Sequence, residues 1–148
     1  MKYGEFKQHF QAVKDGQAKF APVYIVCGDD EYLKDEVLSS FKSVVDPEYA
    51  DFNYSRLSGD NGMSEAVDSA YTFPMFDERK VVVLSLENAP TESDKATFEK
   101  YVSDPCETSV LVIDCDDDAQ KAFKSKKAQV VNCSRLDDNE LIEEINVI

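Results

Sequence analysis

The residues that follow the first apolar run of the chain match a phosphate-binding loop only in part. Such a loop reads G-x-x-x-x-G-K-[ST]: its second glycine lets backbone N–H groups approach the phosphates, its lysine reaches them, and its hydroxyl holds Mg²⁺. Counting from Gly28, the second glycine position holds Leu33, the lysine position keeps Lys34, and the hydroxyl position holds Asp35. The sequence therefore predicts a nucleotide-type fold with a degenerate site, no cofactor and a function based on contact.

The acidic residues of the same loop oppose phosphate binding and leave one alternative open. Residues 29–31 are all acidic and would repel a phosphate. An acidic pair after a first strand also suits a phospho-receiver-like signalling domain, in which Asp29, Asp30 and Asp114 would bind Mg²⁺. That hypothesis lacks an acceptor aspartate after the run 81–84 and a lysine after the last expected strand.

Three other groups of residues could do chemistry but have simpler interpretations. His9 is the only histidine, and no nucleophile motif accompanies it, so it reads as a surface helix residue. The aspartates at 114 and 116–118 offer oxygen ligands, but consecutive acids seldom converge on one ion, and a solvated loop with no metal is expected. The lysines at 121, 124, 126 and 127 could touch DNA or pair with that acidic loop.

An apolar turn is predicted at residues 72–80, TFPMFDERK. Pro74 fixes one backbone angle and interrupts the preceding helix, so the chain turns there before the next strand. Phe73, Met75 and Phe76 stand around this proline. Two interpretations follow: the three side chains cap an edge of the sheet, or they form a protruding apolar plug for the pocket of a partner.

Length and composition bound the class of protein. The chain has 148 residues, which suits one domain, and a net charge of −14. So acidic a chain is poorly suited to hold nucleic acid by phosphate contacts alone. Its four cysteines show no C-x-x-C spacing and are expected to be buried free thiols. No apolar run is long enough for a membrane span and no signal peptide is evident, so the sequence predicts a soluble, cytoplasmic protein with no membrane partner.

Apolar runs alternate with helical patterns along the chain, which predicts an α/β fold with a parallel sheet of about five strands covered on both faces. The run Val23–Cys27 is expected to be central, and the alternating run 52–57 to lie near a sheet edge. The expected strands are Val23–Cys27, 52–57, 81–86, 110–113 and 130–133. The expected helices are Tyr3–Lys14, 31–44, 65–71, one around 98–102, a lysine-rich one at 120–127, and 140–148.

Several blocks, in this order, resemble the N-terminal domain of the delta subunit of the bacterial DNA polymerase III clamp loader. They are YIVCGDDEYL at 24–33, FNYSRLSGD at 52–60, FPMFDERKVVVL at 73–84 and TSVLVI at 108–113. The resemblance implies a three-layer AAA+-like (P-loop NTPase-type) domain that does not hydrolyse ATP. It also implies a non-catalytic role in DNA replication: binding the beta sliding clamp and opening one interface of the ring.

The resemblance also implies which residues make the clamp contact. The family's apolar pair falls on Met75 and Phe76, and Phe73 and Pro74 would set the angle of this plug. A glycine usually follows the aromatic residue in the family, whereas this chain has Asp77. The family's lid and collar domains, which hold the other loader subunits, have no counterpart here, so residues 1–148 are expected to form a single domain with only indirect access to DNA.

Overall fold

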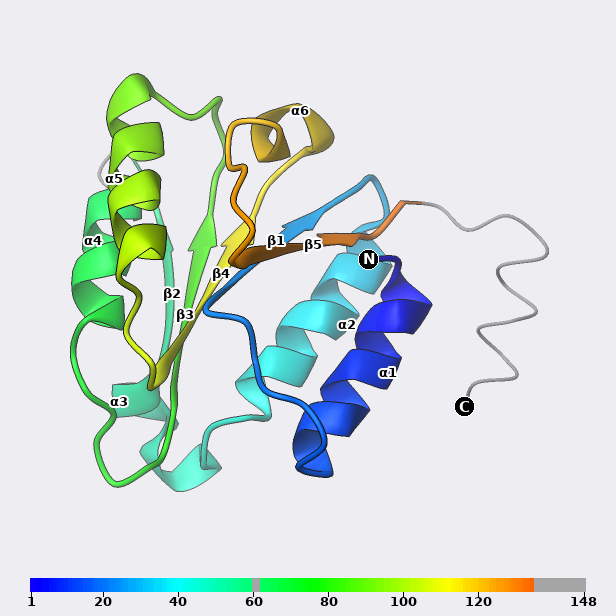
Figure 1. The fold of residues 1–148 in the computed structure, drawn as a ribbon, viewed down its shortest axis with the longest axis vertical. Helices are drawn as coiled ribbons and strands as arrows, with labels where there is room; N and C mark the ends of the chain where they lie inside the picture. The colour runs from blue at the N-terminus through cyan, green and yellow to red at the C-terminus, as the bar shows by residue number, and fades with distance from the viewer. Residues whose placement is uncertain (60–61, 135–148) are drawn as a thin grey trace.

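A five-stranded, fully parallel sheet forms the middle layer of the computed structural model, which describes residues 1–59 and 62–134 (Figure 1). The strand order is β2-β3-β4-β1-β5. The strands are β1 Val23–Cys27, β2 Tyr54–Ser58, β3 Lys80–Ser85, β4 Ser109–Asp114 and β5 Ala128–Asn132. The predicted parallel sheet with its alternating strand at an edge is confirmed. β1 is an interior strand as expected, but β4 takes the middle position.

Helices cover both faces of this sheet and make a three-layer fold (Figure 1). One face is covered by α1 (Tyr3–Lys14) and α2 (Glu31–Lys42), and the other by α4 (Gly62–Ala70) and α5 (Glu92–Ser103). Short helical segments complete the fold: η1 Pro47–Tyr49, α3 Ala50–Asn53 and α6 Asp117–Gln120. Among the described residues, no helix is long and apolar enough to cross a bilayer.

Continuous apolar strands place a core on each side of the sheet. β1, β3 and β4 are buried over almost their whole length, as expected for strands covered on both faces. Under α1 and α2, the ring centroid of Tyr24 lies 4.9 Å from that of Phe41. His9 Nε2 lies 2.6 Å from the Tyr24 hydroxyl, and burial lowers the pKa of His9. His9 is therefore a half-buried helix residue that takes part in the packing between α1 and β1.

The expected strand 52–57 was wrong at its beginning, because Phe52 lies in α3 and β2 starts only at Tyr54. A helix-start signal explains the difference. The Asp46 carboxylate accepts a hydrogen bond from the Glu48 N–H at 2.9 Å, and Pro47 occupies the first helical position. The chain therefore makes a helical turn before it enters the sheet.

The lysine-rich helix expected at 120–127 was also wrong, because only α6 is helical there and the chain turns after Gln120. The Asp116 carboxylate accepts from the Ala119 N–H at 2.7 Å and starts the helix earlier than expected. Phe123 is buried against Phe98, with ring centroids 4.9 Å apart, so the segment that follows serves the core. The helix expected at 140–148 lies outside the described residues.

Because all five strands are parallel, their connections gather at two opposite ends of the sheet. We call the "amino end" the segments that lead into strands, residues 15–22, 46–53, 71–79, 104–108 and 121–127. We call the "carboxyl end" the described segments that leave strands, residues 28–30, 59, 86–91, 115–118 and 133–134. The degenerate loop therefore lies at the carboxyl end, and the predicted apolar turn lies at the amino end.

Candidate functional site

The loop that begins at Gly28 is closed by the backbone of the chain itself. Gly28 has φ +116°, and a Cβ atom there would lie 2.4 Å from the carbonyl carbon of Cys133. The Asp30 N–H donates to the Cys133 carbonyl at 3.0 Å, and the Asp30 carboxylate caps α2 by accepting from the Leu33 N–H at 3.1 Å. The Asp30 N–H is thus engaged by the residue that follows β5, and the Leu33 N–H is engaged by the Asp30 side chain.

Lys34 keeps the lysine position of the loop but is tied to β4. Its ammonium lies 2.9 Å from the Asp114 carboxylate and donates to the Cys115 carbonyl at 3.0 Å. Burial lowers the pKa of Lys34, but the hydrogen bond and charge of Asp114, together with the charges of Glu31 and Cys115, raise it by more, so the net pKa shift is upward. Leu33 is buried in the core and Asp35 is exposed on α2. Lys34 therefore acts as a buried cross-link between α2 and β4.

The same geometry removes the support for a receiver-type magnesium site. Asp114 is paired with Lys34, and its second oxygen lies 3.8 Å from Arg56. Asp30 is used as a helix cap. Within residues 1–59 and 62–134, no three His, Cys, Asp or Glu side chains are placed to hold a metal ion. Nothing in this region favours the phospho-receiver hypothesis.

At the amino end, the apolar turn is exposed to solvent. The exposed fractions are 76% for Phe73, 49% for Met75 and 74% for Phe76, with Pro74 half-buried between them. The predicted exposure of Met75 and Phe76 is confirmed, and the interpretation of these side chains as a cap on the sheet loses its support. Three large apolar groups on one short turn are typical of a contact surface.

The exposed turn is nevertheless fixed by hydrogen bonds. The side chain of Asn53 is fully buried and pairs with the backbone of Met75: Nδ2 donates to the Met75 carbonyl and Oδ1 accepts from the Met75 N–H, each at 2.7 Å. At the base of the turn, the buried Lys80 ammonium donates to the Thr72 hydroxyl. The turn is thus held at its middle and at its base.

Phe76 is held from a second side. It has φ +60°, a left-handed conformation that is rare for a bulky residue, and among the described residues it is the one non-glycine residue with positive φ. Its ring lies against Tyr49, with centroids 5.2 Å apart. The following Asp77 carboxylate accepts from the Asp46 N–H at 2.7 Å. Asp77, in the place of the family's usual glycine, therefore anchors the turn to the start of η1.

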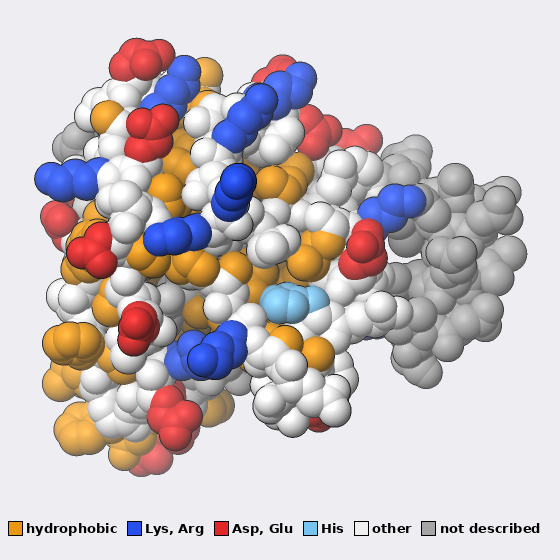
Figure 2. Space-filling view, viewed as in Figure 1, with side chains coloured by type: hydrophobic (Ala, Val, Ile, Leu, Met, Phe, Trp, Pro, Cys, Tyr) orange, Lys and Arg blue, Asp and Glu red, His pale blue; other side chains and the backbone are white. Residues whose placement is uncertain are grey.

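Exposed large apolar side chains are unevenly divided between the two ends of the sheet. At the carboxyl end, among the described residues, only Tyr32 at the start of α2 is of this kind. Those at or beside the amino end are Phe52, Tyr71, Phe73, Met75 and Phe76. Figure 2 shows hydrophobic side chains gathered at the lower left, where Figure 1 draws α3 and the loop between α4 and β3. The amino end is the candidate interaction surface.

Comparison with known proteins decides the family. The model of the family described as DNA polymerase III, delta subunit, matches residues 24–134, which is most of the chain. The chain belongs to the DNA polymerase III delta subunit family. This confirms the resemblance to the delta subunit's N-terminal domain seen in the sequence.

Individual delta relatives agree with this assignment. The chain is 28% identical over 114 residues to the DNA polymerase III subunit delta of Bacillus subtilis (strain 168), covering 70% of this chain and 32% of that protein. It superposes on the B. subtilis DNA clamp loader delta protein (YqeN) with a TM-score of 0.74 at 25% identity, over 93% of this chain and 44% of that one. The chain thus spans less than half the length of either relative.

A more distant structure shows the fold alone. The DNA polymerase III gamma subunit-related protein of Thermotoga maritima matches with a TM-score of 0.54 at 13% identity, over 91% of this chain and 48% of that one. Together with the delta match, this likeness confirms the predicted AAA+-like three-layer architecture.

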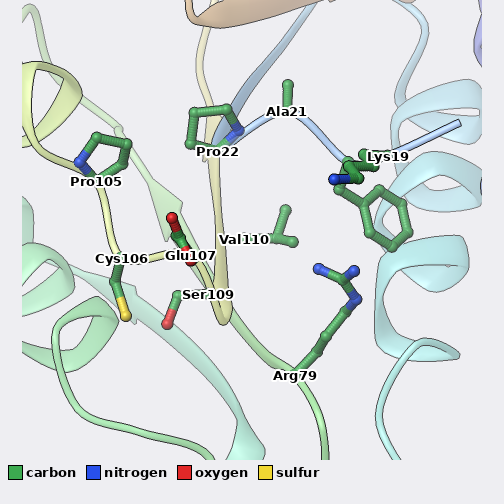
Figure 3. A pocket seen from close by; sticks show the side chains of 10 residues that line it. Lys19, Ala21, Pro22, Arg79, Pro105, Cys106, Glu107, Ser109 and Val110 are labelled. Carbon is green, nitrogen blue, oxygen red and sulfur yellow. The ribbon is translucent and has the colours of Figure 1, made fainter.

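This delta-family chain also has a pocket at the amino end that sequence reasoning did not predict. The pocket has a volume of about 440 Å³, and Arg79 extends toward its middle from the end of the turn (Figure 3). The Arg79 guanidinium lies 5.2 Å from the centre of the Phe20 ring. Lys19 and Glu107 also line the pocket, which contains no histidine. Its mixture of charge and apolar surface suits a protein contact better than catalysis.

Sequence reasoning found the exposed side chains of the apolar turn but missed the residues that hold this turn in place. Asn53, Tyr49 and Asp46 were not predicted to contact the turn. The Asp-Pro-Glu start of η1 could have indicated the helical turn. No sequence pattern could have indicated the pairing of Asn53 with Met75, because the two residues are 22 positions apart and belong to different elements.

Proposed function

We propose that this chain is a clamp-binding and clamp-opening module of the DNA polymerase III clamp loader and that it acts without hydrolysing ATP. The observation that carries the proposal is the exposed, fixed apolar turn in a chain of the delta family. Met75 and Phe76 insert into an apolar pocket of the beta sliding clamp. Phe73 and Pro74 set the angle of this plug.

Binding energy supplies the work of opening. Burying two large apolar side chains stabilises a complex by roughly 1.5–3 kcal/mol each. A ligand shifts a conformational equilibrium only by its differential affinity for the two states. The chain therefore favours the open ring to the extent that the turn and its surroundings fit the open interface better than the closed one. ATP is hydrolysed by other subunits of the loader, and this chain acts on DNA only indirectly, through the clamp.

The absence of ATP use follows from the degenerate loop. Leu33 and Asp35 replace the glycine and the hydroxyl of a phosphate-binding loop, and Lys34 is engaged by Asp114. Glu87 and Asn88 follow β3, where the family of ATP-hydrolysing folds has an Asp-Glu pair for Mg²⁺ and water. Calorimetric titration of ATP and Mg²⁺ should give no saturable heat. A micromolar dissociation constant would contradict this part of the proposal.

The clamp contact is tested with the double variant Met75→Ala, Phe76→Ala. A loss of about 4 kcal/mol weakens binding about a thousandfold. Clamp binding is measured by surface plasmon resonance against the sliding clamp of the same organism, with a thermal melt of each protein. The melt should change little, because both side chains are exposed and add little to the core.

Tyr32→Ala is the matched control, because it removes an exposed aromatic side chain at the opposite end of the sheet. Its clamp affinity should equal that of the parent. A double variant that binds the clamp within threefold of the parent would exclude Met75 and Phe76 from the contact. A melt lowered by many degrees would instead assign the two side chains to the core.

A further inference from the structure

The segment at residues 46–53 holds the apolar turn at three points. Asn53 pairs with both backbone polar groups of Met75 at 2.7 Å, as a neighbouring β-strand would. The Tyr49 ring lies against Phe76, and the Asp46 N–H donates to the Asp77 carboxylate. The segment touches Met75, Phe76 and Asp77 in succession, so its contacts follow the part of the turn that carries the plug.

Asn53 is the best-placed of these residues to determine the shape of the turn. Its side chain is fully buried although Met75, whose backbone it binds, is half-exposed. A buried amide with donor and acceptor both engaged has one orientation, since any rotation leaves polar atoms unpaired. The direction of the Met75 backbone is therefore fixed by a side chain in the interior of the domain.

The positive φ of Phe76 explains why the turn needs this support. A bulky residue at positive φ is disfavoured and persists only where the surroundings hold it. The Tyr49 ring supplies this support by contacting the Phe76 ring, and the Asp77 carboxylate supplies it by anchoring the residue that follows. Without it the turn relaxes toward common backbone angles, and the Phe76 ring points elsewhere.

We propose that residues 46–53, with Asn53 as the central positioning residue, hold the turn in its clamp-binding shape before the clamp is met. This inference rests on the proposed clamp contact. A preformed turn avoids the entropy cost of ordering at the moment of binding. When the binding-competent shape is only partly populated, the apparent dissociation constant rises by the inverse of that fraction. Asn53 thus controls clamp affinity through Met75 and Phe76 without itself touching the clamp.

The first test is the variant Asn53→Ala, compared with Val26→Ala. Val26 is buried in the carboxyl half of β1, so its truncation lowers the thermal midpoint without touching the turn. Asn53→Ala should weaken clamp binding about tenfold, as expected if the competent fraction of the turn falls to about a tenth. Val26→Ala should bind within twofold of the parent. Equal losses in both variants, or no loss in Asn53→Ala, would overturn the inference.

A second measurement separates positioning from general stability. In a Phe76→Ala background, Asn53→Ala should cost less than threefold in clamp affinity, because much of what it positions is already gone. A general loss of stability would give the same tenfold factor in both backgrounds, and that result would overturn the inference. The hydrogen exchange of the Asp46 amide, which donates to the Asp77 carboxylate of the turn, should also become faster in Asn53→Ala, and unchanged exchange there would contradict a positioning role.

Because Asn53 is buried, Tyr49→Ala provides a variant that keeps most of the core intact. Tyr49 is half-buried and lies against the Phe76 ring. Replacing Tyr49 by alanine should weaken clamp binding about threefold, because it removes one of the contacts that support the turn. Parent-like affinity in Tyr49→Ala and in Asn53→Ala, together with a large loss in Met75→Ala, Phe76→Ala, would reject the positioning role alone. Parent-like affinity in all of them would reject the proposed clamp contact itself.

Discussion

The two ends of the sheet differ in which side chains they bury and which they expose to solvent. At the carboxyl end, a lysine that could meet a phosphate is buried against Asp114, and the loop of Gly28 is closed by the backbone of Cys133. At the amino end, three large apolar side chains are kept in solvent on a fixed turn. At the carboxyl end, the polar groups bond to other groups of the domain. At the amino end, the large apolar side chains remain exposed and available for a partner.

The proposed contact lies opposite to the usual location of function in such folds. In open α/β sheets, ligands bind outside the carboxyl ends of the strands. Here the groups at that location stabilise the domain, and the candidate contact surface lies at the opposite end. Under the proposed clamp contact, the fold keeps the framework of a nucleotide site for stability while binding takes place at the opposite end of the sheet.

The largest loss of stability is expected from a substitution at the carboxyl end. Lys34→Ala leaves Asp114 without its closest cationic partner and should lower the free energy of unfolding by about 3 kcal/mol. Clamp affinity of the folded variant should stay within twofold of the parent. Urea denaturation and surface plasmon resonance measure the two quantities. The control is Lys95→Ala, which breaks the exposed pair with Glu92 and should cost less than about 1 kcal/mol.

A substitution in the turn at the amino end should have an intermediate effect, on clamp affinity. Phe73→Ala should weaken clamp binding about tenfold, or about 1.4 kcal/mol, because Phe73 adds contact area beside the main pair. Its unfolding free energy should change little, since the ring is largely exposed. Isothermal titration calorimetry with the clamp gives the affinity. Normal affinity combined with a lowered unfolding free energy would mean that the ring supports the fold instead.

The smallest effect concerns the backbone of the turn. A left-handed conformation is disfavoured by about 1–2 kcal/mol for residues with a Cβ atom, and glycine is free of that cost but loses more chain entropy on folding. Phe76→Gly should therefore be more stable than Phe76→Ala by about 1 kcal/mol, as measured by urea denaturation. Both should bind the clamp poorly. A glycine variant less stable than the alanine variant would indicate that φ at this position is negative in solution.

The elements that were predictable from the sequence are those with local patterns. The apolar runs of β1, β3 and β4 are continuous, short and rich in β-branched residues, which is typical of buried strands, while Pro74 indicated the turn. The alternation of Phe52, Tyr54 and Leu57 was misleading, because Phe52 lies in α3, which directly follows the helical turn that begins at Pro47.

Long-range side-chain partners account for what could not be predicted. Lys34 meets Asp114 because β1 and β4 are neighbours in the sheet, and the two residues are 80 positions apart. Asn53 reaches Met75 from a different element, across a shorter gap of 22 positions. Neither partnership leaves a periodic signal, whereas the exposed side chains of the turn do stand out by type. Sequence reasoning therefore identified the candidate contact residues but not the residues that hold them.

Hydrogen-exchange mass spectrometry of this domain, with and without the sliding clamp, tests most directly which end of the sheet makes the contact. We expect the clamp to slow exchange at residues 71–79 and 46–53 of the amino end. Residues 28–35, around the degenerate loop, should exchange at the same rate in both samples. Slower exchange confined to residues 28–35, with the turn unaffected, would contradict the account.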